Sequence, residues 1–239
     1  MAGIEAFHLE PPTAEDLKVA KRAWEEGTSR YTLRTDDSWW RVLRAKDAPQ
    51  AQSYARTLFP SDGMNRFTPV RKGGSIVPAA YAGSTDKVAL WEIVLRGIRH
   101  NGIRRVPERE VRDRFLVEVR LTQPLALLDV RRSRDANLVI EGKRPPDLTQ
   151  AWPSAYHLTR AWAQALHDSI PNLAGIIYES HQVNGDCIVL YKTHDQDVFH
   201  DLGTSQPIAE TPVRELLIRE ALKASAGVDF GTDDDGDAA

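Results

Sequence analysis

Residues 83–99 read GSTDKVALWEIVLRGIR, and this stretch decides how the rest of the sequence is interpreted. The letters STD at 84–86 are a helix-start signal, because a hydroxyl side chain can cap free N–H groups and an acid suits the positive end of a helix. The strongly apolar residues 87–99 then predict a buried helix. Glu92 lies in the middle of that helix, where a carboxylate is costly to bury without a partner.

The residues around Glu92 leave two interpretations open. Val88, Trp91 and Leu95 share one helical face with it, so the carboxylate is expected at an apolar surface. It either forms a structural ion pair with an arginine, or it is placed against a cation that develops only during a reaction.

Strand and helix signals outside this stretch are mixed rather than regularly alternating. Residues 115–121 alternate apolar and polar side chains, which predicts a half-buried strand. Further strands are expected at 39–44, 76–81, 125–130, 173–178 and 187–191, and further helices at 13–26, 155–167 and 212–224. This order favours an α+β fold with a mixed or antiparallel sheet core and packed helices.

Composition excludes several classes of protein. Among 239 residues, 31 Lys and Arg nearly balance 34 Asp and Glu, which does not favour direct nucleic-acid binding. A single cysteine, Cys187, cannot form an internal disulfide, and the histidines show no metal-binding spacing, so we expect no metal. Neither a signal peptide nor an apolar run of membrane-spanning length is visible, so a cytoplasmic protein without membrane contact is expected.

The chain divides into four parts by composition. We expect an N-terminal helical extension at 1–35, a main domain at 36–205, a C-terminal helix within 206–226 and a disordered tail at 227–239. The tail sequence, VDFGTDDDGDAA from Val228, is acidic and almost free of apolar residues, which is typical of disorder.

Four further side chains are candidates for a binding site. Arg41 lies in an aromatic strand and Arg66 in an irregular segment, and the planar guanidinium of Arg binds phosphate oxygens in pairs. Tyr81 could stack on a flat ring or fill the core. Ser180 follows an expected strand, at the point where a side chain is aimed into a site.

Together these motifs resemble the RES domain. The matching pieces are RFTP at 66–69, YAGST at 81–85, ALWE at 89–92 and GIIYES at 175–180, and their order and spacing carry the resemblance. It runs over about 40–191. The resemblance implies an ADP-ribosyltransferase-like fold, NAD as the substrate rather than a prosthetic group, and a toxin paired with an antitoxin.

The resemblance also implies a role for each candidate. Glu92 would be the catalytic carboxylate and Ser180 would help to seat the nicotinamide ribose. Arg66 and Arg41 would hold phosphates and ribose, with Arg66 part of the catalytic set, and Tyr81 would pack on nicotinamide. Breaking the nicotinamide–ribose bond builds a ribose cation, which a placed carboxylate stabilises.

Several alternatives stay open from the sequence. The acceptor of ADP-ribose could be water, phosphate or a protein, so hydrolysis, phosphorolysis and protein ADP-ribosylation are all compatible with these residues. A non-catalytic nucleotide-binding module and a homo-oligomer also remain open. Thr68 stands where many RES proteins have Asn or Ser, and the Arg-rich segment is particular to this chain, so partner docking cannot be carried over.

Overall fold

The computed structural model describes five stretches of the chain and two single residues between them: 9–44, 65–96, 98, 105–131, 148, 153–191 and 198–230. The α-helices of these residues are α1 (Ala14–Glu25), α2 (Asp86–Ile93), α4 (Tyr156–Ser169) and α5 (Val213–Lys223). None of these helices combines the length and the apolar composition needed to cross a bilayer.

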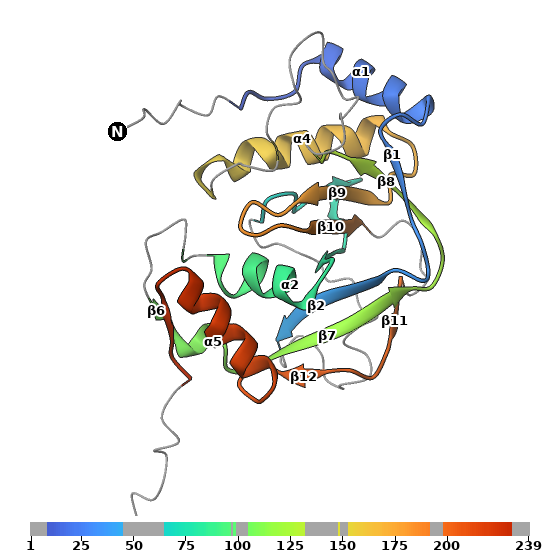
Figure 1. The fold of residues 1–239 in the computed structure, drawn as a ribbon. Coiled ribbons are helices and arrows are strands. Elements are labelled where there is room, and N and C mark those ends of the chain that lie inside the picture. The colour runs from blue at the N-terminus through green and yellow to red at the C-terminus, as the bar shows by residue number, and fades with distance from the viewer. Residues whose placement is uncertain are drawn as a thin grey trace, which may run out of the picture.

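Most of the strands join one curled sheet of nine strands (Figure 1). Its path is β1-β8-β9-β10-β5-β2-β7-β11, and β12 also pairs with β7. Its strands are β1 (Arg30–Leu33), β2 (Ser38–Arg44), β5 (Ala79–Gly83), β7 (Arg114–Leu121), β8 (Leu125–Asp129), β9 (Gly175–Glu179), β10 (Asp186–Tyr191), β11 (Phe199–Asp201) and β12 (Gln206–Pro207).

The sheet is mixed, since β8 and β9 pair in parallel and the other pairs are antiparallel. Two further pairs of two-residue strands lie outside it: β3 (Arg71–Lys72) with β4 (Ser75–Ile76), and β6 (Arg105–Val106) with β13 (Gly227–Val228). The expected α+β class with a mixed, largely antiparallel sheet is therefore confirmed.

Helices cover the sheet in two pairs (Figure 1). The helices α1 and α4 pack together over β9 and β10, through a core that includes Trp24, Trp162 and Tyr191. The helices α2 and α5 pack beside β2 and β7, with Trp91 and Leu217 in their shared core. Apolar side chains on the remaining face of the curled sheet form a third cluster.

The helix around Glu92 is shorter than expected. Thr85 caps it as predicted, accepting a hydrogen bond from the Val88 N–H at 3.1 Å. However, α2 ends at Ile93 instead of continuing to residue 99. The N–H of Leu95 bonds to the carbonyl of Leu90, five residues back, so the regular ladder is broken there. Residues 97 and 99 lie outside the described residues.

Both ends of the main domain depart from the expected boundaries. The N-terminal segment 1–35 is more than a helical extension, because β1 pairs with β8 and so belongs to the sheet. The tail begins later than residue 227, because β13 pairs with β6 and Asp229 forms an ion pair with Arg105 at 3.5 Å. Phe230 also packs against the guanidinium of Arg214. The rest of the expected tail, 231–239, lies outside the described residues.

Candidate active site

A pocket opens between β2, β5, α2 and α4. It encloses about 530 Å³ of empty space, part of which is open to solvent. Three of the predicted residues line it: Arg66, Tyr81 and Glu92. Tyr156 and Tyr178 add two more aromatic rings, so the pocket combines flat apolar walls with one carboxylate and arginine side chains.

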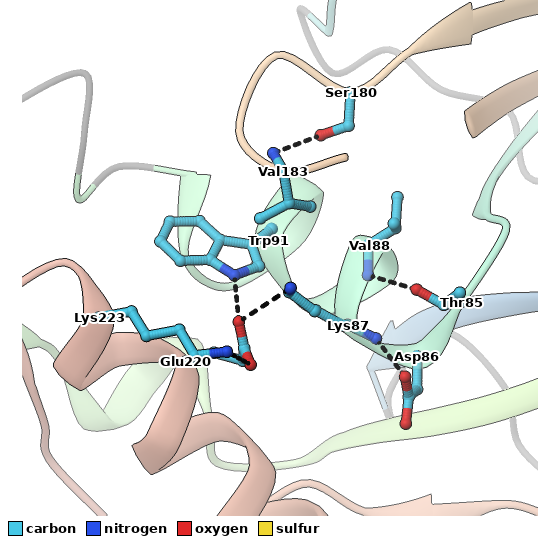
Figure 2. A network of polar contacts seen from close by, with 9 residues as sticks. All are labelled: Thr85, Asp86, Lys87, Val88, Trp91, Ser180, Val183, Glu220 and Lys223. Carbon is cyan, nitrogen blue, oxygen red and sulfur yellow. Dashed lines mark hydrogen bonds and ion pairs between the residues drawn. The ribbon is translucent and has the colours of Figure 1, made fainter. Parts of the chain in front are cut away.

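Ser180 reaches this pocket through Glu92. The Ser180 hydroxyl donates a hydrogen bond to Oε1 of Glu92 at 2.6 Å, which is short enough for a charge-assisted bond. The hydroxyl oxygen of Ser180 also accepts from the backbone N–H groups of Gln182, at 3.2 Å, and of Val183, at 3.4 Å, and Figure 2 shows the bond from Val183. The hydroxyl is therefore held from one side by the loop after β9, and it fixes the half-buried carboxylate on the other.

The segment that carries Arg66 is fastened by backbone contacts. Thr159, from α4, donates to the carbonyl of Arg66, and Tyr191 donates to the carbonyl of Phe67 at 3.3 Å. The Phe67 ring is fully buried and meets Tyr178 edge to face, with centroids 5.1 Å apart. These anchors explain why an irregular stretch can hold an arginine at a fixed place.

The charge on Arg66 is stabilised within the pocket. Burial opposes that charge, but the Glu92 carboxylate, followed by Tyr178 and Tyr156, favours it, and the net effect raises the pKa of Arg66. Its guanidinium lies 5.7 Å from the ring centroid of Tyr156 and 5.5 Å from that of Tyr178. Such an arrangement keeps a permanent cation beside aromatic surfaces, as recognition of an anionic, ring-bearing ligand requires.

Tyr81 is oriented by Thr68 and by the backbone of Phe67. Its phenol oxygen lies 3.2 Å from the Thr68 hydroxyl and accepts the N–H of Phe67 at 3.1 Å. Burial raises the pKa of Tyr81 to about 12, so the phenol stays protonated at neutral pH. Thr68 thus positions the Tyr81 ring.

Arg41 does not line this pocket, so the structure does not bring it together with Arg66. Side chains alternate along β2, so Trp40 and Val42 face the pocket while Arg41 faces the other side of the sheet. There its guanidinium lies 5.1 Å from the ring centroid of Phe199, and burial lowers the pKa of Arg41 to about 10.

Helix α2 is held in place by α5. Trp91, the neighbour of Glu92, is fully buried and donates its indole N–H to Oε2 of Glu220 at 3.1 Å (Figure 2). Lys223 donates to the other carboxylate oxygen at 2.6 Å, and Lys87 lies 3.7 Å from Oε2. Burial alone would raise the pKa of Glu220, but these partners together lower it.

Two glycines let strands approach α2 closely. A Cβ atom at Gly83 would lie 2.7 Å from the backbone nitrogen of Ala89, and one at Gly185 would lie 2.5 Å from a methyl of Val88. Only glycine fits at either position without moving the helix. The end of β5 and the β9–β10 hairpin therefore set the position of α2, and with it that of Glu92.

Sequence reasoning missed several side chains of the pocket. Tyr156 and Tyr178 are apolar-face residues of a helix and a strand, and their pattern is that of ordinary core positions. Arg96 lies within a run of arginines, so nothing in the sequence separates it from surface charge. Cys187 also lines the pocket, and burial raises the pKa of its thiol well above the usual range.

Fold and site together define an α+β domain with one aromatic-walled pocket, in which an arginine faces a carboxylate fixed by a serine. Residues 38–210 match the family model of the RES domain, which is more than half of the chain. The chain therefore belongs to the RES domain family.

Comparisons with curated proteins and with solved structures add little to the family match. No curated protein matches the chain. Among solved structures, a chain of the Mycobacterium tuberculosis MbcT–MbcA toxin–antitoxin complex is similar, with 14% identity and a TM-score of 0.46. The similarity covers 80% of this chain and 93% of that chain.

Proposed function

We propose that this protein is an NAD-consuming enzyme that cleaves the nicotinamide–ribose bond. The observation that carries the proposal is the 2.6 Å hydrogen bond from Ser180 to Glu92 at the wall of a pocket that also holds Arg66. A carboxylate oriented in this way can stabilise a positive charge that develops in front of it.

The proposed reaction uses these side chains as follows. The C–N bond between ribose and nicotinamide breaks, and its electron pair leaves with the nicotinamide ring, which becomes neutral. The ribose carbon gains oxocarbenium character, which the Glu92 carboxylate stabilises. An oxygen nucleophile then forms a bond to that carbon, and its proton passes to solvent, so charge and atoms balance.

Two other side chains of the pocket can bind groups of NAD. Tyr81 offers a ring on which nicotinamide can pack, and Arg66 offers two N–H groups for phosphate or ribose oxygens. Water and phosphate are both suitable acceptors. Protein ADP-ribosylation uses the same first step and differs only in the acceptor.

Membership of the RES domain family supports a toxin restrained by an antitoxin protein. An enzyme that drains NAD from its own cytoplasm needs such a partner, most simply one that covers the pocket. The proposal therefore places the protein in the cytoplasm with NAD and an antitoxin as its binding partners.

The test is incubation of the purified chain with NAD while released nicotinamide is measured. Wild type should release nicotinamide, and Glu92→Gln should lower the rate by roughly 100-fold or more, because Gln keeps the shape and loses the charge. Radiolabel that moves from NAD to protein would identify a protein acceptor. Near-wild-type release by folded Glu92→Gln would remove Glu92 from the mechanism.

The same pair of proteins tests the biological role. Induced in bacteria without a partner, wild type should arrest growth and lower cellular NAD, whereas Glu92→Gln at a matched level should do neither. Normal growth with normal NAD on wild-type induction would refute the toxin proposal.

A further inference from the structure

Three arginines that the proposed reaction does not use lie on or beside the elements that form the pocket. Trp40 and Val42 line the pocket from β2, and Arg44 follows two residues later on the same face of that strand. Arg114 is directly opposite Arg44 on β7. Arg96, just beyond α2, lines the pocket itself.

These arginines carry more positive charge than their described surroundings neutralise. Glu110 contacts Arg114 and lies 3.7 Å from Arg44, so one carboxylate serves both side chains. A third arginine, the largely exposed Arg109, lies 3.9 Å from the same carboxylate. Like charges that share one carboxylate repel one another, and a further anion between them would offset that repulsion.

Arg114 is the most constrained of the group. Its side chain is only 8% exposed, and its Nε–H is buried without an acceptor among the described residues. Burial lowers the pKa of Arg114; Glu110 opposes that effect, and the positive charges of Arg44 and Arg96 add to it. Arg44 and Arg96 are thus close enough to act electrostatically on Arg114, whose Nε–H is left for a ligand.

We infer that Arg44, Arg96 and Arg114 form a phosphate-binding subsite at the outer end of the pocket. A phosphate group fits for two reasons: it presents several oxygens to planar guanidinium forks, and it is small enough to reach a nearly buried side chain. The phosphate has two sources, either free inorganic phosphate or a phosphate carried by the dinucleotide. This inference rests on the proposed function only for the identity of the dinucleotide.

Direct binding tests the subsite without turnover. The full chain is titrated with inorganic phosphate at constant ionic strength, because surface charges are otherwise screened to different extents. Wild type should bind saturably, and Arg96→Gln and Arg44→Gln should each weaken binding at least tenfold. Arg112→Gln should change it less than twofold, because Arg112 is 64% exposed and pairs with Glu108 instead. Arg114 is not substituted in this experiment, because its removal would leave Glu110 without its nearly buried ion-pair partner.

Turnover then separates the two sources. If inorganic phosphate is the acceptor, it should raise nicotinamide release from NAD, and its oxygen should form the new bond to ribose as nicotinamide leaves. If the dinucleotide supplies the phosphate, inorganic phosphate should slow nicotinamide release by competing with NAD, and Arg96→Gln should raise KM for NAD.

Two outcomes overturn the inference: wild type fails to bind phosphate saturably, or binding is unchanged in both variants. Nicotinamide release with either outcome leaves the proposed function in place. Conversely, arginine-dependent phosphate binding without nicotinamide release supports the subsite and counts against the proposed function.

Discussion

Replacing Ser180 with alanine tests how the catalytic carboxylate is prepared for reaction. The substitution removes the hydroxyl that donates to Oε1 of Glu92 at 2.6 Å, and it leaves the Glu92 side chain in place. The backbone N–H groups of Gln182 and Val183 lose their acceptor as well, and because Gln182 is buried, this loss should lower the stability of the fold. The expected effect on activity comes from the position of the carboxylate.

The size of the effect follows from the type of bond. A hydrogen bond to a charged group contributes about 1.5–3 kcal/mol net. Each 1.36 kcal/mol corresponds to a tenfold change in rate, so Ser180→Ala should lower kcat/KM for NAD by about 10- to 150-fold. Most of the loss should be in kcat, because the carboxylate matters most when the ribose cation forms.

The assay is steady-state release of nicotinamide, with Ser84→Ala as the matched control. The Ser84 hydroxyl accepts a backbone N–H from Asp186 at 3.0 Å, so the control removes a serine hydroxyl from the same hairpin junction without touching Glu92. In a Glu92→Gln background, adding Ser180→Ala should lower kcat/KM for NAD by less than a further threefold. A loss below twofold in the single variant, or fully multiplicative losses in the double variant, would refute the positioning role of Ser180.

Three other predictions concern substrate binding, the contacts of Glu220 that hold α2 in place, and the C-terminus. Arg66→Ala should weaken NAD binding in calorimetry more than Arg66→Lys, and Lys should still bind less tightly than wild type, because only the guanidinium grips two oxygens; equal affinity of Ala and wild type would make Arg66 structural. Glu220→Leu should lower the free energy of unfolding in urea by about 2 kcal/mol, because the buried Trp91 N–H loses its acceptor. Glu220→Gln should lower the free energy of unfolding by less than Glu220→Leu does. The difference between Glu220→Gln and wild type should shrink as pH falls below about 4.5, because a carboxylate whose folded pKa is lowered stabilises the fold only while it is ionised. A difference that does not change with pH would contradict this. A chain that ends at Phe230 should keep the full-length Tm, whereas one that ends at Ala226 should lose about 2–4 °C for each kcal/mol contributed by the β6–β13 contacts; equal Tm values would show that these contacts contribute nothing.

The elements with a clear period could be predicted from sequence. The alternation in 115–121 gave a strand with the expected faces, and the cap at Thr85 marked the start of α2. Glu92 could be singled out because a carboxylate within an apolar run is costly to bury without a partner. Its contact with Ser180 joins residues 88 positions apart, so periodicity could not show it.

The errors have equally specific causes. The sequence placed Arg41 in an aromatic strand, but it could not tell which face of β2 borders the pocket. The short strand β13 is too short to show a period in the sequence, and its place depends on contacts with β6, far earlier in the chain, and with α5. Tyr156 and Tyr178 were hidden because a pocket wall and a core have the same composition.

The close approach of Gly83 and Gly185 to α2 limits how the pocket can be redesigned. Because Gly83 lies against the backbone nitrogen of Ala89 and both glycines lie against methyls of Val88, a larger residue at either position would press on α2 itself. The two glycines thereby fix the position of α2 and of the Glu92 carboxylate that it carries. Variation in specificity has to come from side chains that project into the pocket from elsewhere, such as Trp40, Tyr156 and Arg96, and a library aimed at new substrates should be drawn from those positions.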